Sequence, residues 1–325
     1  MRHWMTVILL GGSLLPIFSA HTNVPQPHVQ DKDVIYKLKI VQPYKQTIPH
    51  SVTLPKFTEE VKLITDLGLI FINAYINGKG PFVFWLDTGS EITLISNKIV
   101  KELELPLVAK IEKHIQASHS KKKMDSHLAI ADKINIGDAT FHKAPIFTLD
   151  EKHKAFELLK NLDVVGIIGM NMFYDVTLTL DIAHNKFYMQ KNFTPETNAI
   201  KLTGLYFSPV IYVKIKNRGK TKQYPFLVDS GFNGGIEMPD CNTNTNDNTR
   251  ISHSLDFFSK VEKGFYHNIQ GKLSIGQLDY RNPEVRYVPS NCKKKKPFGL
   301  LGTKFLKDKL VSINLRKRLL SIIQN

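Results

Sequence analysis

Two aspartates in this chain stand at the ends of apolar, strand-like segments, and a small hydroxyl residue and a glycine follow each of them. Asp87 lies in PFVFWLDTGSEITLIS (residues 81–96), and Asp229 lies in YPFLVDSGFNGGIEMP (residues 224–239). Carboxylates are rarely buried unless another group pairs with them or uses them. Two carboxyl groups in close contact cannot both ionise cheaply, so they would share a proton, and one would act as a base while the other acts as an acid.

The two aspartate segments belong to a longer internal repeat. LIFINAYINGKGPFVFWLD and VIYVKIKNRGKTKQYPFLVD each read as a strand, a Gly-bearing turn and a second strand. Further along, DVVGIIGMNMFYDVTLTLDIAHNKFYM (163–189) is similar to PFGLLGTKFLKDKLVSINLRKRLLSI (297–322), with Gly166 matching Gly299. A lone Asp-Thr/Ser-Gly tripeptide is a weak signal, but its repetition with the same neighbours indicates a duplicated unit.

With this doubled motif, the sequence resembles the pepsin and retropepsin group of aspartic peptidases, of the two-lobe, bacterial retropepsin-like type. The likeness covers roughly residues 65–322. It implies that Asp87 and Asp229 are the catalytic pair, and that Thr88 and Ser230 brace the two active-site loops against each other. It implies an aspartic endopeptidase that hydrolyses peptide bonds with a water activated between two aspartates, one from each lobe.

Alternating segments dominate the chain, and helical periodicity is confined to short pieces such as residues 97–103 and 152–162. We therefore expect a mostly β protein. The resemblance implies a two-lobe, pepsin-like acid protease fold in which each lobe is a retropepsin-like closed barrel. Gly89 and Gly231 should allow tight turns that bring backbone N–H groups close to the carboxylates.

The expected organisation has five parts: a signal peptide at 1–20, an N-terminal segment at 21–64, lobe 1 at 65–190, a linker at 191–205 and lobe 2 at 206–325. The N-terminal segment is either a removable pro-segment or a strand joining the lobes, because DVIYKLKIVQPY alternates like a strand. One chain supplies both aspartates, so we expect a monomer.

The first 20 residues have the features of an export signal. Arg2 precedes an apolar stretch at residues 5–18, and Ala20 is a small residue near the expected cleavage point. The segment is short for a membrane span, although an uncleaved anchor stays open as the alternative. We therefore expect a periplasmic or secreted protein.

The chain has two cysteines, Cys241 and Cys292, which are 51 residues apart. In an exported protein two cysteines most simply form one disulfide, with two free thiols as the alternative.

A flap should cover the cleft between the lobes. The candidate in lobe 1 is the hairpin at residues 111–137, with Ser118 and His119 near its tip. In lobe 2 the equivalent hairpin brings Phe265 and Tyr266 toward the cleft. The flap of pepsin carries a tyrosine, and none stands in this tip, so the resemblance is nearer to the retropepsins.

Three histidines near this flap are the main candidates for a metal site. The spacing of His114, His119 and His127 matches no zinc motif, and exposed polar histidines are the preferred interpretation. We expect no metal and no cofactor.

The chain is strongly basic, with 44 Lys and Arg against 29 Asp and Glu and a formal net charge of +15. Such a charge suggests attraction to anionic surfaces of the cell envelope besides a peptide or protein substrate, while nucleic acid is not expected. Two rival functions remain: a non-catalytic peptide-binding protein of the same fold in the cell envelope, for which Phe232 after the second motif is the best support, and a cationic envelope-binding module.

Overall fold

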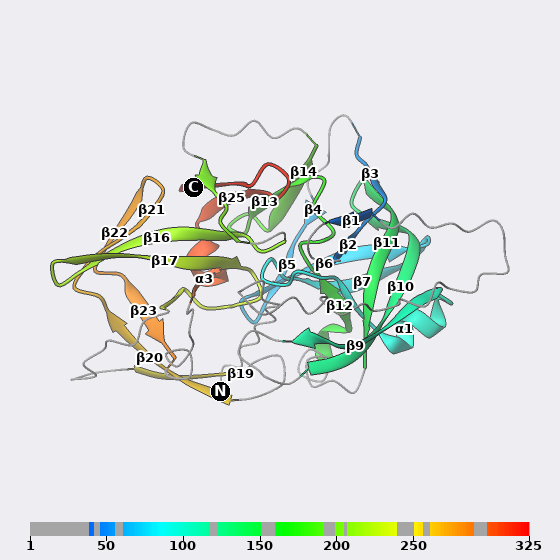
Figure 1. The fold of residues 1–325 in the computed structure, drawn as a ribbon, viewed down its shortest axis with the longest axis horizontal. Helices are drawn as coiled ribbons and strands as arrows, with labels where there is room; N and C mark the ends of the chain where they lie inside the picture. Colours follow the sequence, from blue (N-terminus) through cyan, green and yellow to red (C-terminus); the bar gives the residue numbers. More distant parts are fainter. Residues whose placement is uncertain are drawn as a thin grey trace.

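The protein is described from a computed structural model over residues 39–41, 46–55, 61–116, 123–150, 160–191, 199–204, 207–238, 250–255, 261–288 and 298–324. Its strands form two nine-stranded sheets, a six-stranded sheet and a small two-stranded sheet (Figure 1). The prediction of a mostly β chain is confirmed.

The first nine-stranded sheet belongs to the N-terminal half. Its strands are β3 (Ser51–Thr53), β5 (Ile64–Asp66), β6 (Leu69–Ile76), β7 (Lys79–Leu86), β8 (Leu94–Ser96), β9 (Leu107–Gln116), β10 (Lys123–Ile136), β11 (Ala139–Leu149) and β12 (Val164–Ile168). The second belongs to the C-terminal half and contains β16 (Val210–Asn217), β17 (Lys220–Asp229), β18 (Ile236–Met238), β19 (Arg250–Leu255), β20 (Val261–Asn268), β21 (Gly271–Ile275), β22 (Leu278–Arg281), β23 (Glu284–Tyr287) and β24 (Gly299–Gly302).

Each half contains the same hairpin, β6–β7 in the first and β16–β17 in the second. Both turns have two central residues with positive φ: Asn77 at 50° and Gly78 at 80°, then Arg218 at 47° and Gly219 at 78°. Two-residue turns of this kind match the right-handed twist of the paired strands. The repeat found in the sequence is therefore a repeat of local structure.

Strand pairing also corresponds between the halves. In the first half β10 pairs with β6 and also with β11. The strand pairings therefore lead from β11 through β8, β12, β7, β6 and β10 back to β11. In the second half the corresponding strands are interrupted at residues 269–270 and 282–283, which divide them into β20 and β21 and into β22 and β23. A closed barrel in each half stays a prediction.

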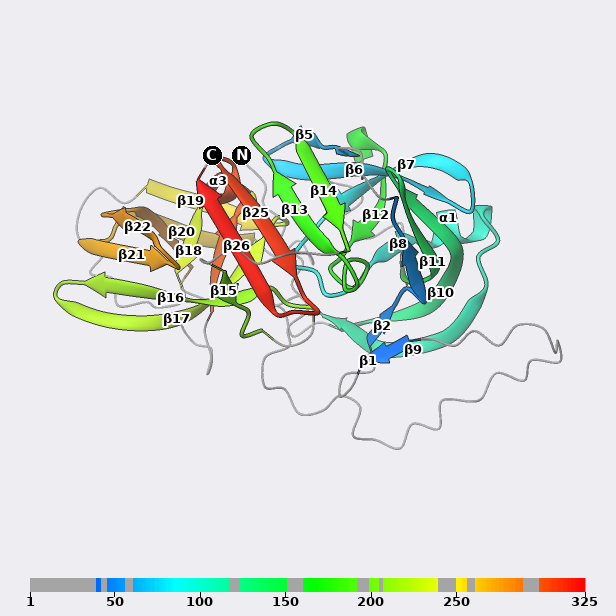
Figure 2. The ribbon, with the colours of Figure 1, turned by 90° about the horizontal axis from the view of Figure 1, so that it is seen from above.

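The six-stranded sheet joins the two halves, as Figure 2 shows from above. Its strands, in order, are β15 (Ile200–Lys201), β26 (Leu319–Gln324), β25 (Lys309–Asn314), β13 (Thr177–Asp181), β14 (Lys186–Gln190) and β4 (Val61–Lys62). At its centre, Thr179 on β13 pairs with Ser312 on β25, and their hydroxyl oxygens lie 2.8 Å apart. These residues are 133 positions apart, the offset of the sequence repeat, so each is the other's counterpart and a local two-fold axis passes between them.

One large hydrophobic core continues through both halves and the sheet that joins them. It includes Leu86 and Phe141 from the first half and Phe226 and Val311 from the second. Two smaller clusters, one around Trp85 and one around Phe232, lie apart from this core. Burial of apolar side chains on this scale is the main stabilisation available to a β protein.

The described helices are short. α1 (Asn97–Glu102) begins at Ser96, whose hydroxyl accepts a hydrogen bond from the Ile99 N–H at 3.3 Å, so the helix expected at 97–103 is confirmed. In the piece expected at 152–162, the described residues form a 3₁₀ turn, Lys160–Leu162. Serine is a favoured N-cap because its oxygen satisfies an otherwise unpaired N–H.

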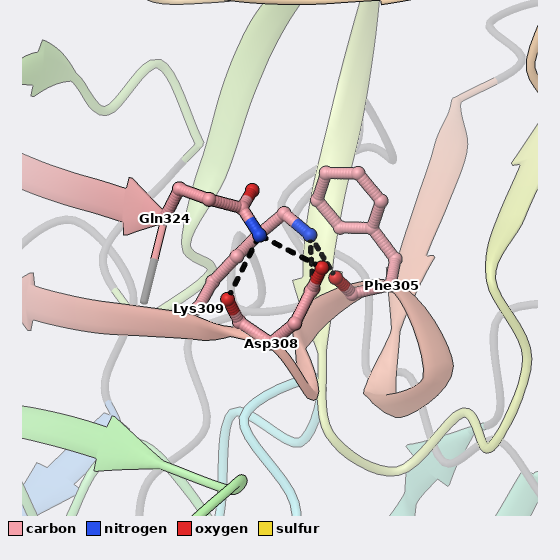
Figure 3. Close-up of polar contacts among 4 residues, drawn as sticks. All are labelled: Phe305, Asp308, Lys309 and Gln324. Carbon is pink, nitrogen blue, oxygen red and sulfur yellow. Dashed lines mark hydrogen bonds and ion pairs between the residues drawn. The ribbon is translucent and has the colours of Figure 1, made fainter.

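The other short helix, α3 (Thr303–Leu306), is held at its end by a buried lysine (Figure 3). The Lys309 Nζ donates to the Phe305 carbonyl at 2.7 Å and forms an ion pair with Asp308. The Gln324 amide in turn donates to the Asp308 carboxylate at 2.8 Å. A cation at a helix C-terminus satisfies a free carbonyl and complements the helix dipole.

Of the alternating stretch at residues 33–44, which was expected to join the halves, the structure describes residues 39–41. Its described part, β1 (Lys39–Val41), pairs only with β2 (Gln46–Ile48), and β4 of the same N-terminal segment enters the joining sheet instead. The expected linker likewise contains β15, which pairs with β26. No helix among the described residues is long and apolar enough to cross a lipid bilayer. The expected signal peptide lies outside these residues.

Candidate active site

The two aspartates occupy equivalent places at the ends of β7 and β17. Asp87 directly follows β7, and Asp229 is the last residue of β17. Both side chains are completely buried. Each strand runs parallel to a glycine-bearing neighbour, β12 beside β7 and β24 beside β17. Both carboxyl groups therefore lie in the interior of the protein, at the ends of well-packed strands.

The two aspartate loops meet face to face. A Cβ atom placed on Gly89 would lie 2.4 Å from Oδ1 of Asp229, and one on Gly231 would lie 2.4 Å from Oδ1 of Asp87. Each glycine of one loop therefore lies against the carboxyl group of the other loop. Only a residue without a side chain allows this approach.

Backbone N–H groups hold one oxygen of each carboxyl group. The Asp87 Oδ1 accepts hydrogen bonds from Gly89 at 2.8 Å and Ser90 at 3.2 Å. The Asp229 Oδ1 accepts one from Gly231 at 2.9 Å. The Oδ2 atoms of both aspartates are buried and accept no hydrogen bond from a backbone N–H or a hydroxyl group, while the two carboxyl groups hydrogen-bond to each other. Unpaired buried oxygens are costly, which makes them places where a bound group or water is favoured.

The expected brace between the loops is present and reciprocal. The Thr88 hydroxyl donates to the Val228 carbonyl at 2.8 Å and accepts from the Ser230 N–H at 2.9 Å. The Ser230 hydroxyl donates to the Leu86 carbonyl at 2.8 Å and accepts from the Thr88 N–H at 2.9 Å. These four buried hydrogen bonds fix one loop against the other.

The environment favours the protonated form of both aspartates. Burial raises the pKa of Asp87 to about 7, although the N–H groups of Gly89 and Ser90 oppose the shift. Burial, followed by the charge of Asp87, raises the pKa of Asp229 well above its ordinary value. Since two adjacent carboxyl groups titrate together, these shifts belong to the pair. Near neutral pH the pair holds at least one proton.

The repeated glycines explain how the supporting strands come so close. A Cβ on Gly166 would lie 2.2 Å from the Leu94 carbonyl oxygen, and one on Gly302 would lie 2.3 Å from the Phe232 carbonyl oxygen. The Ile168 carbonyl, two residues after Gly166, accepts a hydrogen bond from the Asp87 N–H at 3.1 Å. The glycines of the late repeat thus allow backbone contact with the aspartate loops.

Two further contacts between the halves were not foreseen from the sequence. Glu91, four residues after Asp87, accepts a hydrogen bond from the Ser208 hydroxyl. Asn233, four residues after Asp229, donates to the Leu67 carbonyl at 2.6 Å. Glu91 and Asn233 each lie four residues after an aspartate, and this equal spacing is the feature of the sequence that could have revealed both contacts. It was missed because Glu91 and Asn233 are different residue types.

The flap residues are only partly placed. Ser118 and His119 lie outside the described residues, between β9 and β10. Phe265 and Tyr266 lie on β20, half-buried. Tyr266 stands opposite Arg286 on β23, and the Arg250 guanidinium covers its ring at 4.5 Å. A cleft-lining role for Phe265 and Tyr266 stays a prediction.

Tyr266 belongs to a row of residues that differs between the halves. In the C-terminal half the row runs from Tyr266 through Arg286 to Glu237, and the last two form a buried ion pair. The corresponding row in the N-terminal half is Leu128, Phe147 and Leu94, which is wholly apolar. Glu237 contributes to the raised pKa of Asp229. The duplicated halves therefore surround the aspartates with different side chains.

Phe232 does not enter the space between the aspartates. Its side chain is 2% exposed and packs with Leu227 and Leu300. Its N–H donates to the Asp229 carbonyl at 3.2 Å, as the Ser90 N–H does to the Asp87 carbonyl at 3.1 Å. The bulkier residue therefore leaves the backbone of the second loop like that of the first.

Cys241 and Cys292 both lie outside the described residues, so the disulfide stays a prediction. His119 is likewise outside, and no group of His, Cys, Asp and Glu suited to a metal ion occurs among the described residues.

Part of the chain is similar to a known protein family. Residues 72–172 match the family model of an aspartyl protease. The matched segment includes β7, the Asp87 loop and β12, and it supports assignment of the protein as a peptidase. The second aspartate, Asp229, lies beyond the match.

A second comparison is weaker and points to another kind of protein. Over 110 residues, the chain is 28% identical to a UDP-Gal:alpha-D-GlcNAc-diphosphoundecaprenol beta-1,4-galactosyltransferase of Shigella boydii. The aligned part covers 32% of this chain and 45% of that protein, so the chain spans less than half the length of this relative.

Proposed function

We propose that the protein is an aspartic endopeptidase in which Asp87 and Asp229 act together as the catalytic pair. The observation that carries the proposal is the reciprocal approach of each loop's glycine to the other loop's carboxyl group. The match of residues 72–172 to the aspartyl protease model supports it from the sequence.

The chemistry follows from one shared proton. The ionised member of the pair takes a proton from water, while the protonated member donates a hydrogen bond to the peptide carbonyl oxygen. The raised pKa values of the pair keep at least one proton on it near neutral pH, as this division into acid and base requires. The two buried Oδ2 atoms, which accept no hydrogen bond from the backbone or from a hydroxyl group, are suited to hold the water and the carbonyl oxygen.

We propose further that the chain works as a two-lobe monomer in a compartment outside the cytoplasm. The contacts of Thr88 with Val228 and of Ser230 with Leu86 are made within one chain and complete the pair without a second copy. The corresponding pairing of strands in the two halves supports a barrel-like form for each lobe. The extracytoplasmic location rests on the N-terminal sequence alone.

Cleavage of a mixed peptide library tests the proposal. We expect internal peptide bonds to be cut, and a peptidic transition-state inhibitor of aspartic peptidases to block cutting. Asp229→Asn protein purified in the same way is the control for contaminating peptidases. Equal cleavage by wild-type and control protein, or insensitivity to the inhibitor, would overturn the proposal.

The alternative function, a non-catalytic peptide-binding protein, no longer has a specific residue in its favour. Phe232 was its basis, and this side chain packs among apolar residues on its own side of the loop. The partial likeness to a galactosyltransferase carries no second proposal, because no feature of the described site favours sugar transfer over peptide hydrolysis.

A further inference from the structure

The hairpin β16–β17 carries an unusual run of positive charge. Between Tyr212 and Tyr224 there is no acidic residue, and every second residue from 214 to 222 is basic: Lys214, Lys216, Arg218, Lys220 and Lys222. In both ribbon views the turn of this hairpin lies at one end of the molecule (Figures 1 and 2). We define the basic patch as these five residues with Lys272 and Arg281 of the neighbouring strands.

Strand register places three of these charges side by side. Lys216 on β16 stands opposite Lys272 on β21, which stands opposite Arg281 on β22. Like charges directly opposite each other on neighbouring strands destabilise a sheet. This row therefore opposes folding, and an anionic surface placed against it would remove the repulsion.

Three lysines of the patch have no acidic partner among the described residues. Asp279 pairs with Lys272 at 2.7 Å, and the neighbouring positive groups lower the pKa of Asp279. The side chains of Lys214, Lys216 and Lys220 are exposed, and no acidic group among the described residues pairs with them. Most of the charge of the patch thus faces solvent.

The outer face of β16 combines an exposed aromatic ring with exposed lysines. Residues on alternate positions of β16 share its outer face, so Tyr212 lies on the same face as Lys214 and Lys216. Tyr212 is 52% exposed, and an exposed aromatic ring beside lysines is typical of proteins that lie at a membrane surface. Arg218 and Lys220, on either side of Gly219, place further positive charge at the turn.

We propose that this basic patch docks the protein on an anionic lipid surface. The patch is separate from the aspartate pair, because Lys220 and Asp229 are at opposite ends of β17, about 30 Å apart at the rise of an extended strand. Docking would hold the protein at the membrane, where protein substrates of the same surface are concentrated. The docking proposal stands independently of the proposed peptidase activity.

Vesicle co-sedimentation tests the proposal directly. The full chain is mixed with vesicles of neutral phosphatidylcholine or of phosphatidylcholine with 30% phosphatidylglycerol, at about 50 mM and 300 mM salt. We expect binding only to the anionic vesicles, weakened by salt, because screening shortens the range of exposed charges. Binding to neutral vesicles measures any contribution of the apolar N-terminal stretch.

Matched charge variants locate the binding surface. We expect Lys214→Gln, Lys216→Gln and Lys220→Gln together to weaken binding to anionic vesicles at least about ten-fold, since each basic side chain contributes at such a surface. The control removes the same charge from the exposed lysines Lys98, Lys101 and Lys133 of the N-terminal half, and it should bind like wild type.

Several results would overturn the docking proposal. They are equal binding by the patch variant and wild type, equal losses in the patch and control variants, and equal binding to neutral and anionic vesicles. Tight binding to soluble single-stranded DNA without binding to vesicles would assign the patch to an anionic polymer instead. Asp229→Asn should bind vesicles normally, so failure of the peptidase proposal leaves this test intact.

Discussion

Gly89 lies directly against the carboxyl group of Asp229, close enough that a Cβ atom at position 89 would be 2.4 Å from an oxygen of that carboxyl group. Gly231 has the same relationship to Asp87. Each half of the chain therefore completes the surroundings of the other half's aspartate. The function of either aspartate depends on the packing of both halves.

Gly89→Ala should disturb the site strongly. The added methyl group would overlap a buried carboxyl group that backbone hydrogen bonds hold in place, and we expect a loss of about 1–3 kcal/mol in the free energy of unfolding together with loss of peptide cleavage. Gly235→Ala is the matched control, because nothing lies within 4 Å of its added Cβ. Urea unfolding and a cleavage assay measure both effects. Normal cleavage by Gly89→Ala would contradict the close approach.

Asp87→Asn and Asp229→Asn should each abolish cleavage without unfolding the protein. Asn keeps the shape of the side chain but removes either the base or the acid, which costs about 10²–10⁴-fold in rate. The double variant should be about as inactive as either single variant, since the two residues act as one unit. Turnover is measured beside a melting curve for all three. Retained turnover in Asp229→Asn would point to a single-lobe enzyme that dimerises through Asp87.

Thr88→Val should loosen the brace between the halves. It leaves the Val228 carbonyl and the Ser230 N–H buried without their partner, at about 1–3 kcal/mol for each. Thr88→Ser keeps the hydroxyl group and should retain most of the stability. Denaturant titration of the two variants gives the comparison, and equal stability of Thr88→Val and wild type would show that the brace contributes nothing.

Stability should fall as the pH rises from about 4 to about 7. Folding raises the pKa of Asp87 from 3.8 to about 7 and raises that of Asp229 as well, so the folded state binds more protons than the unfolded state in this range. The stability present below the unfolded pKa is then lost as the pH passes through the folded pKa. Melting temperatures across pH 4–8 measure the trend. Asp87→Asn/Asp229→Asn should show a shallower fall, and an identical pH profile would refute the assignment.

The active protein should be a monomer. Both aspartates and all four hydrogen bonds of the brace come from one chain, so dilution should not reduce the activity per molecule. Sedimentation of active fractions across a hundred-fold range of concentration tests this. Activity confined to a dimeric fraction would count against it.

The sequence by itself determined the repeated elements and the identity of the central residues. The apolar run before Asp87 predicts a buried strand, and its echo before Asp229 predicts a second. The hairpin turns at Asn77–Gly78 and Arg218–Gly219 were also readable, because the central residues of such turns need positive φ. These features depend on neighbours along the chain, so a local pattern is enough to reveal them.

Only the tertiary structure decided how the halves meet. The contacts of Glu91 with Ser208 and of Asn233 with Leu67 join residues more than 100 positions apart, and no local pattern marks the partners. The entry of β4 into the joining sheet was likewise not predicted, because its two residues are too few to show a period. Such pairings depend on how whole sheets pack together. The alternation of apolar and polar residues along one strand does not specify that packing.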